Sequence, residues 1–313
     1  MGHLNQRGSV LILSLWVLIF LSLVGASLAS RAQIELRLSH YPWEEVRLRE
    51  VVREAVIECS DFWQKQSVLF TSFNQPWFQN PQIFKDQTLP DGAYTVVHDS
   101  VYGAEDETAK INLNQASPDV LARLFASHAY VVPAILDWRL PGPGHWDDVY
   151  ATAGYGVRHG PFKNLEELLL VKGMTEDIFQ DVEKELTVNT AGEVNINTAS
   201  GRVLEALGLK TILVNKILTF RNGSDGQIGT ADDGVFTTRE TVLPLLKKTS
   251  MMTEDDIQSL NTLLQRRQLS VRSDRICLHI LARLTERPVT RRFVIVAKAR
   301  ASSISILSWR EIL

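Results

Sequence analysis

The residues best suited to chemistry in this chain lie in one polar loop, residues 222–234, with the sequence NGSDGQIGTADDG. Three carboxylates, Asp225, Asp232 and Asp233, fall within nine residues of this loop. Ca²⁺ takes about six to eight oxygen ligands, and glycines let a loop turn its own carbonyl groups inward. The twelfth position from Asp225 is Phe236 instead of a bidentate glutamate, so the loop is not an EF-hand. From these residues alone, a calcium site and a solvated Asp-Gly turn both remain open.

The sequence contains no motif typical of an enzyme active site. The seven histidines show no H-E-x-x-H or similar ligand spacing, and no G-x-S-x-G, P-loop or dinucleotide-binding fingerprint is present. We therefore expect a non-enzymatic protein with no catalytic residues and no organic cofactor.

The two cysteines, Cys59 and Cys277, lie far apart and lack metal-ligand spacing. In an exported protein they could form one disulfide, which would tie the end of an N-terminal helix to a C-terminal strand. The alternative is a pair of buried free thiols, since cysteine is among the most buried residue types.

The composition excludes a global attraction to nucleic acid. The chain has 313 residues, 33 Lys and Arg against 36 Asp and Glu, and a net charge of −3. This length gives room for roughly two domains. Binding to nucleic acid would need a local basic patch.

The N-terminal segment is long and apolar enough to cross a membrane. Residues 9–30 carry no charged side chain, and as a helix they span roughly 33 Å. Arg7 precedes this run and favours a cytoplasmic N-terminus. Three interpretations of this segment are possible. It is a cleaved secretory signal ending near residues 27–29, a plain signal anchor, or the start of a longer helix. The run exceeds the usual 7–15 residues of a signal peptide, and an amphipathic pattern over residues 35–63 favours the longer helix.

The start of the apolar run resembles a type IV prepilin leader. Residues 6–13 read QRGSVLIL, and in that family a dedicated peptidase cuts after the glycine. The resemblance therefore implies a leader of residues 1–8, cleavage between Gly8 and Ser9, and Ser9 as a methylated mature N-terminus followed by a transmembrane segment over residues 9–30.

The fifth mature residue is normally Glu in that family, and here it is Leu13. A carboxylate in lipid is costly unless it is paired, and a subunit with no neighbour ahead of it has no ammonium to pair with. Lack of this Glu is a mark of the minor pseudopilin K family of type II secretion systems. From this position alone, the alternative is equally good: Leu13 simply makes the membrane-spanning segment more apolar.

Strand-like runs rich in Val, Ile and Phe occur at both ends of the globular region, with helical patterns between them. The predicted strands are residues 93–99, 111–113, 276–282, 292–299 and 303–309. We predict an α+β fold with the long N-terminal transmembrane helix. Residues 31–110 and 269–313 would form a pilin-like domain with antiparallel strands, interrupted by an all-α domain at residues 111–268.

The predicted insertion contains an internal repeat. Residues 111–124, INLNQASPDVLARL, recur at residues 194–207 as VNINTASGRVLEAL. Each copy predicts a short extended piece, a serine N-cap at Ser117 or Ser200, and a helix. Asparagines in both copies are expected to form hydrogen bonds in the turns.

Such repeats resemble helix-hairpin-helix or SAM-like units, which suggests an alternative function as a DNA-binding membrane protein of a DNA-uptake apparatus. One candidate hairpin, around Gly173, is followed by Glu176 and Asp177, and the other, around Gly208, lacks a second glycine. Acidic neighbours repel phosphate, so the sequence argues against nucleic-acid binding.

The resemblance to the minor pseudopilin K family covers nearly the whole chain. The segments similar to that family occur in the family's order; they are residues 135–139 (ILDWR), 160–168 (GPFKNLEEL) and 186–199. The acidic pair that usually follows the Asp-Trp motif is replaced by residues 139–142 (RLPG), which puts any ion contact made there in relatives in doubt.

The resemblance implies a structural subunit that forms the tip of a periplasmic pseudopilus and helps to start its assembly. It implies a single-pass protein of the inner membrane with its globular part in the periplasm. The implied partners are minor pseudopilins I and J, the major pseudopilin fibre, the inner-membrane assembly platform and the prepilin peptidase. The family also holds structural Ca²⁺ in a loop of this form, which assigns Asp225, Asp232 and Asp233 as ligands, with Gln227 and Thr230 as weaker candidates.

We predict that N-terminal sequencing of the mature protein, isolated from membranes of its host, gives a chain that starts at Ser9. Recovery of an intact chain starting at Met1 would contradict the prepilin interpretation. A chain starting near Ser30 would instead indicate a cleaved secretory signal.

Overall fold

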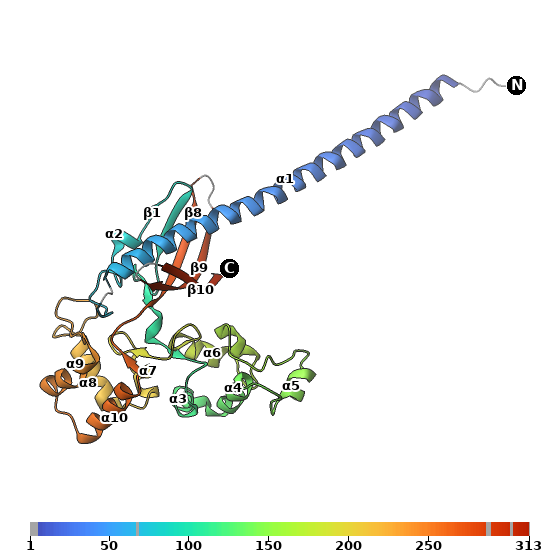
Figure 1. The fold of residues 1–313 in the computed structure, drawn as a ribbon. Helices are drawn as coiled ribbons and strands as arrows, with labels where there is room; N and C mark the ends of the chain where they lie inside the picture. The colour runs from blue at the N-terminus through green and yellow to red at the C-terminus, as the bar shows by residue number, and fades with distance from the viewer. Residues whose placement is uncertain (1–5, 67–68, 286–288, 301–302, 313) are drawn as a thin grey trace.

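The structure is a computed structural model that describes residues 6–66, 69–285, 289–300 and 303–312; of residues 6–12, 32–42 and 300 it describes the backbone alone. Helix α1 (Gln6–Gln66) is 61 residues long and extends far beyond the globular part of the chain (Figure 1). Its second half buries one face. The buried side chains recur every three or four residues, as expected for a helix with one face on a core. They are Leu48, Val51, Val52, Ala55, Val56, Cys59 and Trp63.

A six-stranded antiparallel sheet packs against this face of α1. The strand order is β1-β2-β8-β9-β10, and β3 also pairs with β8. The core between α1 and the sheet is called the sheet core below. The strands are β1 (Gln87–Thr88), β2 (Gly92–Val96), β3 (Glu105–Asp106), β8 (Arg275–Leu284), β9 (Thr290–Arg300) and β10 (Ser303–Ile312).

The expected mixture of a long apolar N-terminal helix and an antiparallel sheet is confirmed. Strands β8, β9 and β10 contain the three predicted C-terminal strands. The run at residues 93–99 is strand β2, which ends at Val96, and residues 111–113 begin with the short strand β4 (Ile111–Asn112).

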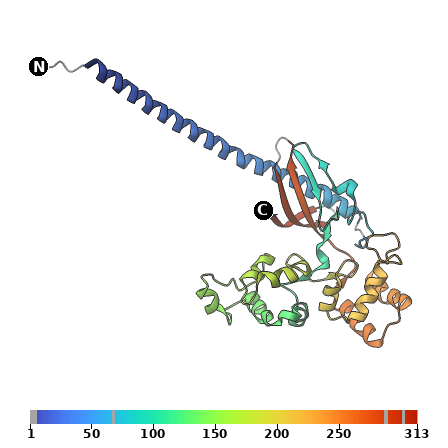
Figure 2. The same ribbon diagram turned by 180° about the vertical axis from the view of Figure 1, so that it is seen from behind.

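The chain between Ile111 and Val271 forms a second hydrophobic core, called the helical core below. Figures 1 and 2 show its helices in two neighbouring groups, α3–α6 and α7–α10. The limits predicted for the inserted domain, residues 111–268, stay a prediction. The helices outside α1 are α2 (Pro81–Phe84), α3 (Pro118–Leu124), α4 (Val132–Arg139), α5 (Asp147–Thr152), α6 (Glu176–Val182), α7 (Gly201–Ala206), α8 (Thr211–Arg221), α9 (Arg239–Thr249) and α10 (Glu254–Gln265).

The internal repeat extends well beyond the matched sequence segments. In each copy the first short strand pairs in parallel with a strand at the end of the copy: β4 with β5 (Leu186–Thr187), and β6 (Val194–Asn195) with β7 (Leu269–Ser270). The predicted N-caps are confirmed, because the hydroxyls of Ser117 and Ser200 each accept a hydrogen bond from the backbone N–H three residues later. Each copy is therefore a closed unit of short strands and helices.

The asparagines of the repeat also bind distant backbone. The Asn114 side chain donates to the Phe162 carbonyl at 2.9 Å and accepts from the Phe162 N–H at 2.7 Å. In the second copy, Asn197 exchanges the same pair of hydrogen bonds with Phe236, both at 2.9 Å. These contacts join the start of each copy to a loop roughly 40 to 50 residues later, which maintains the fold of the copy.

One buried polar network connects the two cores at the carboxylate of Asp106 in β3. Its Oδ2 accepts hydrogen bonds from Asn195 Nδ2 at 2.7 Å and Thr198 Oγ1 at 2.6 Å, and its Oδ1 accepts from the Thr108 N–H at 2.8 Å. Asn195 Nδ2 also lies 3.0 Å from the carbonyl of Thr71, in the segment after α1. Burial raises the pKa of Asp106, although the hydrogen bonds from Thr198 and Asn195 oppose this effect.

We predict that Asp106→Ala lowers the free energy of unfolding by about 2–4 kcal/mol, because it leaves buried donors without acceptors. The matched control is Asp61→Ala. Asp61 forms an exposed ion pair with Lys65, so its replacement should change stability by no more than about 0.5 kcal/mol. Urea unfolding of the full chain in detergent micelles, followed by tryptophan fluorescence, measures both values. Equal effects of the two substitutions would contradict the role given to Asp106.

The stability difference between the wild type and Asp106→Ala should also depend on pH. Because the folded pKa of Asp106 is raised above its unfolded value of about 3.9, the contribution of this group is fully present below that pH. It falls as the pH rises toward the folded pKa. The difference in unfolding free energy should therefore be larger at about pH 4 than at about pH 7. A difference that grows between these pH values would show that the pKa is not raised.

Candidate functional site

The first half of α1 presents apolar side chains that are all exposed in the described part of the chain. The stretch Leu13–Arg31 has 19 residues, a mean hydropathy of 2.1 and no buried side chain. At about 1.5 Å per residue it spans about 28 Å, close to the thickness of a bilayer core. This agrees with a single N-terminal membrane anchor. Leu13, the position of the missing Glu, is 67% exposed.

The predicted cleavage site lies at the edge of what the structure describes. Gly8 and Ser9 belong to the helical backbone of α1, but their side chains are outside the described part of the chain. Residues 1–5 of the predicted leader are outside it as well. Cleavage between Gly8 and Ser9 therefore stays a prediction.

The second half of α1 also exposes an apolar stripe, formed by Trp43, Val46 and Ile57 and interrupted by the exposed ion pair of Glu50 and Arg53. With about 100° of rotation per residue, these three side chains fall within about 60° of one another around the helix. The same rotation places them roughly opposite Cys59 and Trp63, which face the sheet core. The stripe therefore lies on the side of α1 that faces away from the sheet core.

The candidate calcium loop, residues 222–234, turns around Asp232. Oδ2 of Asp232 accepts hydrogen bonds from the N–H and the hydroxyl of Ser224, both at 2.6 Å, and from the Asp225 N–H at 3.2 Å. The Thr230 hydroxyl lies 2.7 Å from Asp232 Oδ1 and 3.1 Å from Asp233 Oδ1. Hydrogen bonds from Ser224 and Thr230 hold the pKa of Asp232 well below its usual value, so this carboxylate is ionised at neutral pH.

The five predicted calcium ligands divide into two groups. Asp232 and Asp233 share the Thr230 hydroxyl, whereas Asp225 turns toward the Gln227 N–H at 2.7 Å. Across the described ranges, the three aspartates do not form a group with ligand atoms within 4.8 Å of one another. A cation that used all three would therefore have to draw Asp225 toward the other two carboxylates.

The loop contacts the segment that follows α1. A Cβ atom on Gly229 would lie 3.3 Å from the Phe78 side chain, and the Arg221 guanidinium lies 5.5 Å above the Phe73 ring. Gly223 has a φ of +64°, and a Cβ there would lie 2.6 Å from Asp232 Oδ2, so glycine is required at this position. The loop thus lies between the helical core and the end of α1.

Two arginines, the buried Arg221 and the half-buried Arg139, support the repeat and were missed by the sequence analysis. Arg139 donates to the carbonyls of Leu113 and Ala116 at 2.6 and 2.7 Å, and Arg221 donates to the carbonyl of Ala199 at 2.5 Å. Both arginines end the helix that follows the repeated motif, α4 in one copy and α8 in the other. A longer alignment of the repeat, through the aromatic-Arg pair at the end of each helix, could have found them.

Of the two alternatives for Cys59 and Cys277, the structure has the pair of free, buried thiols and not the disulfide. Cys59 belongs to the sheet core, whereas Cys277 packs with Val294 and Val296 on the opposite face of the sheet. The sheet therefore separates the two sulfur atoms. Burial raises the pKa of the Cys59 thiol to about 12 and that of Cys277 well above its usual value, so both remain thiols in this state.

The hairpins that suggested DNA binding have acidic surroundings. Glu176 and Asp177 form the first turn of α6, directly after the first hairpin. At the second hairpin, Lys210 forms an ion pair with Asp255 at 2.5 Å. The charge of Lys210 is therefore already paired with a carboxylate, which weakens its attraction to a phosphate backbone.

Comparisons with known proteins support the fold. No protein-family model and no curated protein sequence matches the chain. Among solved structures, a chain of the GspK–GspI–GspJ complex from the type 2 secretion system of enterotoxigenic Escherichia coli matches with a TM-score of 0.66 and 16% identity. The match covers 88% of this chain and 99% of that chain. At this identity the likeness shows a shared fold, and we conclude that the chain has a pseudopilin-like fold.

Proposed function

We propose that this chain is a structural minor pseudopilin of a type II secretion system, not an enzyme, and that α1 is its assembly surface. The observation that carries this proposal is the set of exposed apolar side chains on both halves of α1, those of the stretch Leu13–Arg31 and those of Trp43, Val46 and Ile57. The first half suits lipid and neighbouring membrane helices. The stripe of Trp43, Val46 and Ile57 lies above the membrane and suits parallel helices of neighbouring subunits.

The place of the subunit at the tip of the fibre is part of this proposal. Leu13 lies where a carboxylate would need the ammonium of a preceding subunit, and an apolar side chain needs no such partner. The protein with the similar fold was solved in a complex with GspI and GspJ, which makes minor pseudopilins I and J the proposed partners. Arg7 ahead of the apolar run supports a cytoplasmic N-terminus and a periplasmic globular part.

We also propose that the loop at residues 222–234 holds a structural Ca²⁺ ion. Asp232 and Asp233 already lie around one hydroxyl, and an ionised Asp232 suits a hard cation. Asp225, with Gln227 and Thr230 as weaker candidates, would complete the oxygen set. The ion would hold the loop against the segment after α1, where Gly229 contacts Phe78.

We predict that Ile57→Glu lowers the recovery of minor pseudopilins I and J with the full chain at least about 10-fold, because assembly would bury an unpaired charge. The matched control is Ile212→Glu in α8. The two isoleucines are 57% and 68% exposed, but Ile212 lies on a helix of the helical core. The measurement is affinity purification from detergent-solubilised membranes of cells that express all three proteins. Equal recovery with both variants would contradict α1 as the assembly surface.

We predict that Ca²⁺ raises the thermal unfolding temperature of the full chain, since an ion at about 100 times its dissociation constant stabilises by about 2.7 kcal/mol. The double variant Asp232→Asn with Asp233→Asn should lose this shift. Asp255→Asn, which removes an exposed carboxylate outside the loop, should keep it. If Ca²⁺ raises the unfolding temperature of the double variant by the same amount, the ion binds outside this loop. Differential scanning calorimetry with Ca²⁺, and with Mg²⁺ for comparison, decides between these outcomes.

A further inference from the structure

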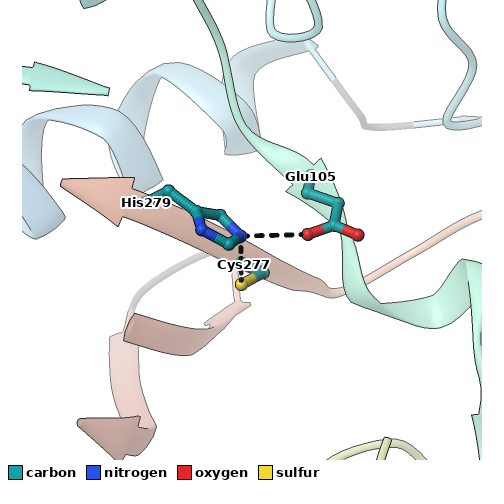
Figure 3. A group of neighbouring side chains, drawn as sticks. All are labelled: Glu105, Cys277 and His279. Carbon is teal, nitrogen blue, oxygen red and sulfur yellow. Dashed lines mark hydrogen bonds and ion pairs between the residues drawn. The ribbon is translucent and has the colours of Figure 1, made fainter. Parts of the chain in front are cut away.

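Three side chains of types that bind metals converge on the face of the sheet away from α1. Strand β3 pairs with β8 so that Glu105 lies opposite Cys277, and His279 follows two residues later on the same face. Figure 3 shows the three side chains pointing toward one another. Among the described residues, this is the only group of three or more such side chains with ligand atoms within 4.8 Å of one another.

Both contacts within this cluster use the same ring nitrogen. His279 Nε2 lies 3.2 Å from Glu105 Oε2 and 3.6 Å from Cys277 Sγ. A ring nitrogen carries either a hydrogen or a free lone pair, so it cannot donate to the carboxylate and accept from the thiol at the same time. If Nε2 carries the hydrogen, this one hydrogen is shared between the carboxylate and the sulfur, which is a weak acceptor.

Two of the three separations between the ligand atoms suit a tetrahedral zinc ion, and all three are within 4.8 Å. With Zn–N and Zn–O near 2.0–2.2 Å and Zn–S near 2.3 Å, tetrahedral ligands lie about 3.4 Å apart for N and O and about 3.6 Å apart for N and S. The observed separations at His279 Nε2 are 3.2 Å to Glu105 Oε2 and 3.6 Å to Cys277 Sγ. Movements of about 0.2 Å would bring these two pairs to the ideal geometry.

The charges around the cluster suit a divalent cation. Lys110 Nζ lies 3.0 Å from Glu105 Oε1 and 3.2 Å from Glu107 Oε2, so it binds the oxygen of Glu105 that does not contact His279. With Cys277 as a thiolate, two carboxylates and one sulfur face a single ammonium, which leaves two negative charges in excess. A Zn²⁺ ion would neutralise them, and the thiol proton would leave to solvent as the metal–sulfur bond forms.

Access to the cluster is open from one side. The side chains of Glu105 and His279 are 30% and 29% exposed, while Cys277 is buried. They line a cleft of about 500 Å³ between the sheet and the helical core. This cleft gives a water molecule room to occupy a fourth position, the usual arrangement of a zinc ion with three protein ligands.

We propose that Glu105, Cys277 and His279 form a three-ligand Zn²⁺ site, with water from the cleft as the fourth ligand. Thiolate and imidazole ligands select zinc over calcium, so this site differs in chemistry from the loop at residues 222–234. The metal would bind β3 to β8 directly beside Asp106, where the chain leaves the sheet for the helical core.

The test uses Co²⁺ as a spectroscopic probe of the metal-free full chain in detergent micelles. We expect one equivalent of Co²⁺ to give the thiolate-to-cobalt charge-transfer band and the intense visible bands of a four-coordinate site, and Zn²⁺ to displace it. Cys277→Ser should abolish the charge-transfer band, and His279→Gln should weaken Zn²⁺ binding by at least about 100-fold. An excess of Ca²⁺ should leave the spectrum unchanged.

Cys59→Ser is the matched control, because Cys59 is the other buried cysteine and lies on the opposite face of the sheet. It should bind Co²⁺ like the wild type. Absence of the charge-transfer band in the wild type, or its persistence in Cys277→Ser, would overturn the proposal. If Cys277→Ser does not fold, as judged by circular dichroism, His279→Gln and Glu105→Gln decide, and affinities equal to that of the wild type in both variants would overturn the site.

Discussion

Two hydrogen bonds into the buried carboxylate of Asp106, from Asn195 and Thr198, connect the two cores of this chain. Asn195 and Thr198 come from the second repeat, whereas Asp106 lies on the short strand β3 of the sheet. Because an unpaired buried donor costs about 1–3 kcal/mol, the two cores cannot change their relative position at this point without a large loss. Glu105, the preceding residue of β3, contacts Lys110 and His279 instead. A strand of two residues thus supplies one carboxylate to the connection and another to the candidate zinc site.

The short helices of the helical core are stabilised by the same kinds of contact in both repeats. Helices of six to eight residues, such as α3, α4 and α7, are too short to be stable by themselves in water. In each copy an asparagine binds the backbone of a distant phenylalanine, and an arginine satisfies carbonyl groups at the repeated motif. These arginines serve the interior, so they add nothing to a surface that could bind nucleic acid.

The second half of helix α1 has apolar side chains on two opposite faces. One face of its second half must pack on the sheet, and the opposite face carries Trp43, Val46 and Ile57 in the open. Burying a side chain of this size gives roughly 1.5–3 kcal/mol, so the exposed stripe and the apolar first half represent a large driving force for association. Lipid can cover the first half, and parallel helices of neighbouring subunits can cover the stripe. This arrangement, together with the pseudopilin-like fold, supports the proposed role in assembly.

The sequence by itself determined the elements whose causes are local: the apolar run of α1, the three long C-terminal strands and the serine caps of the repeat. The sequence could also have predicted the faces of β8. Ile276, Leu278 and Ile280 alternate with Cys277 and His279, which places these two residues on the other face of the strand. Only the tertiary structure decided which of the two faces α1 covers, and hence that Cys59 and Cys277 lie apart. It also decided that Glu105 meets His279 across 174 positions of sequence and that Asp225 turns away from Asp232. Such contacts depend on how whole elements pack, and packing is set by the sum of many distant apolar and polar contacts that no local pattern records.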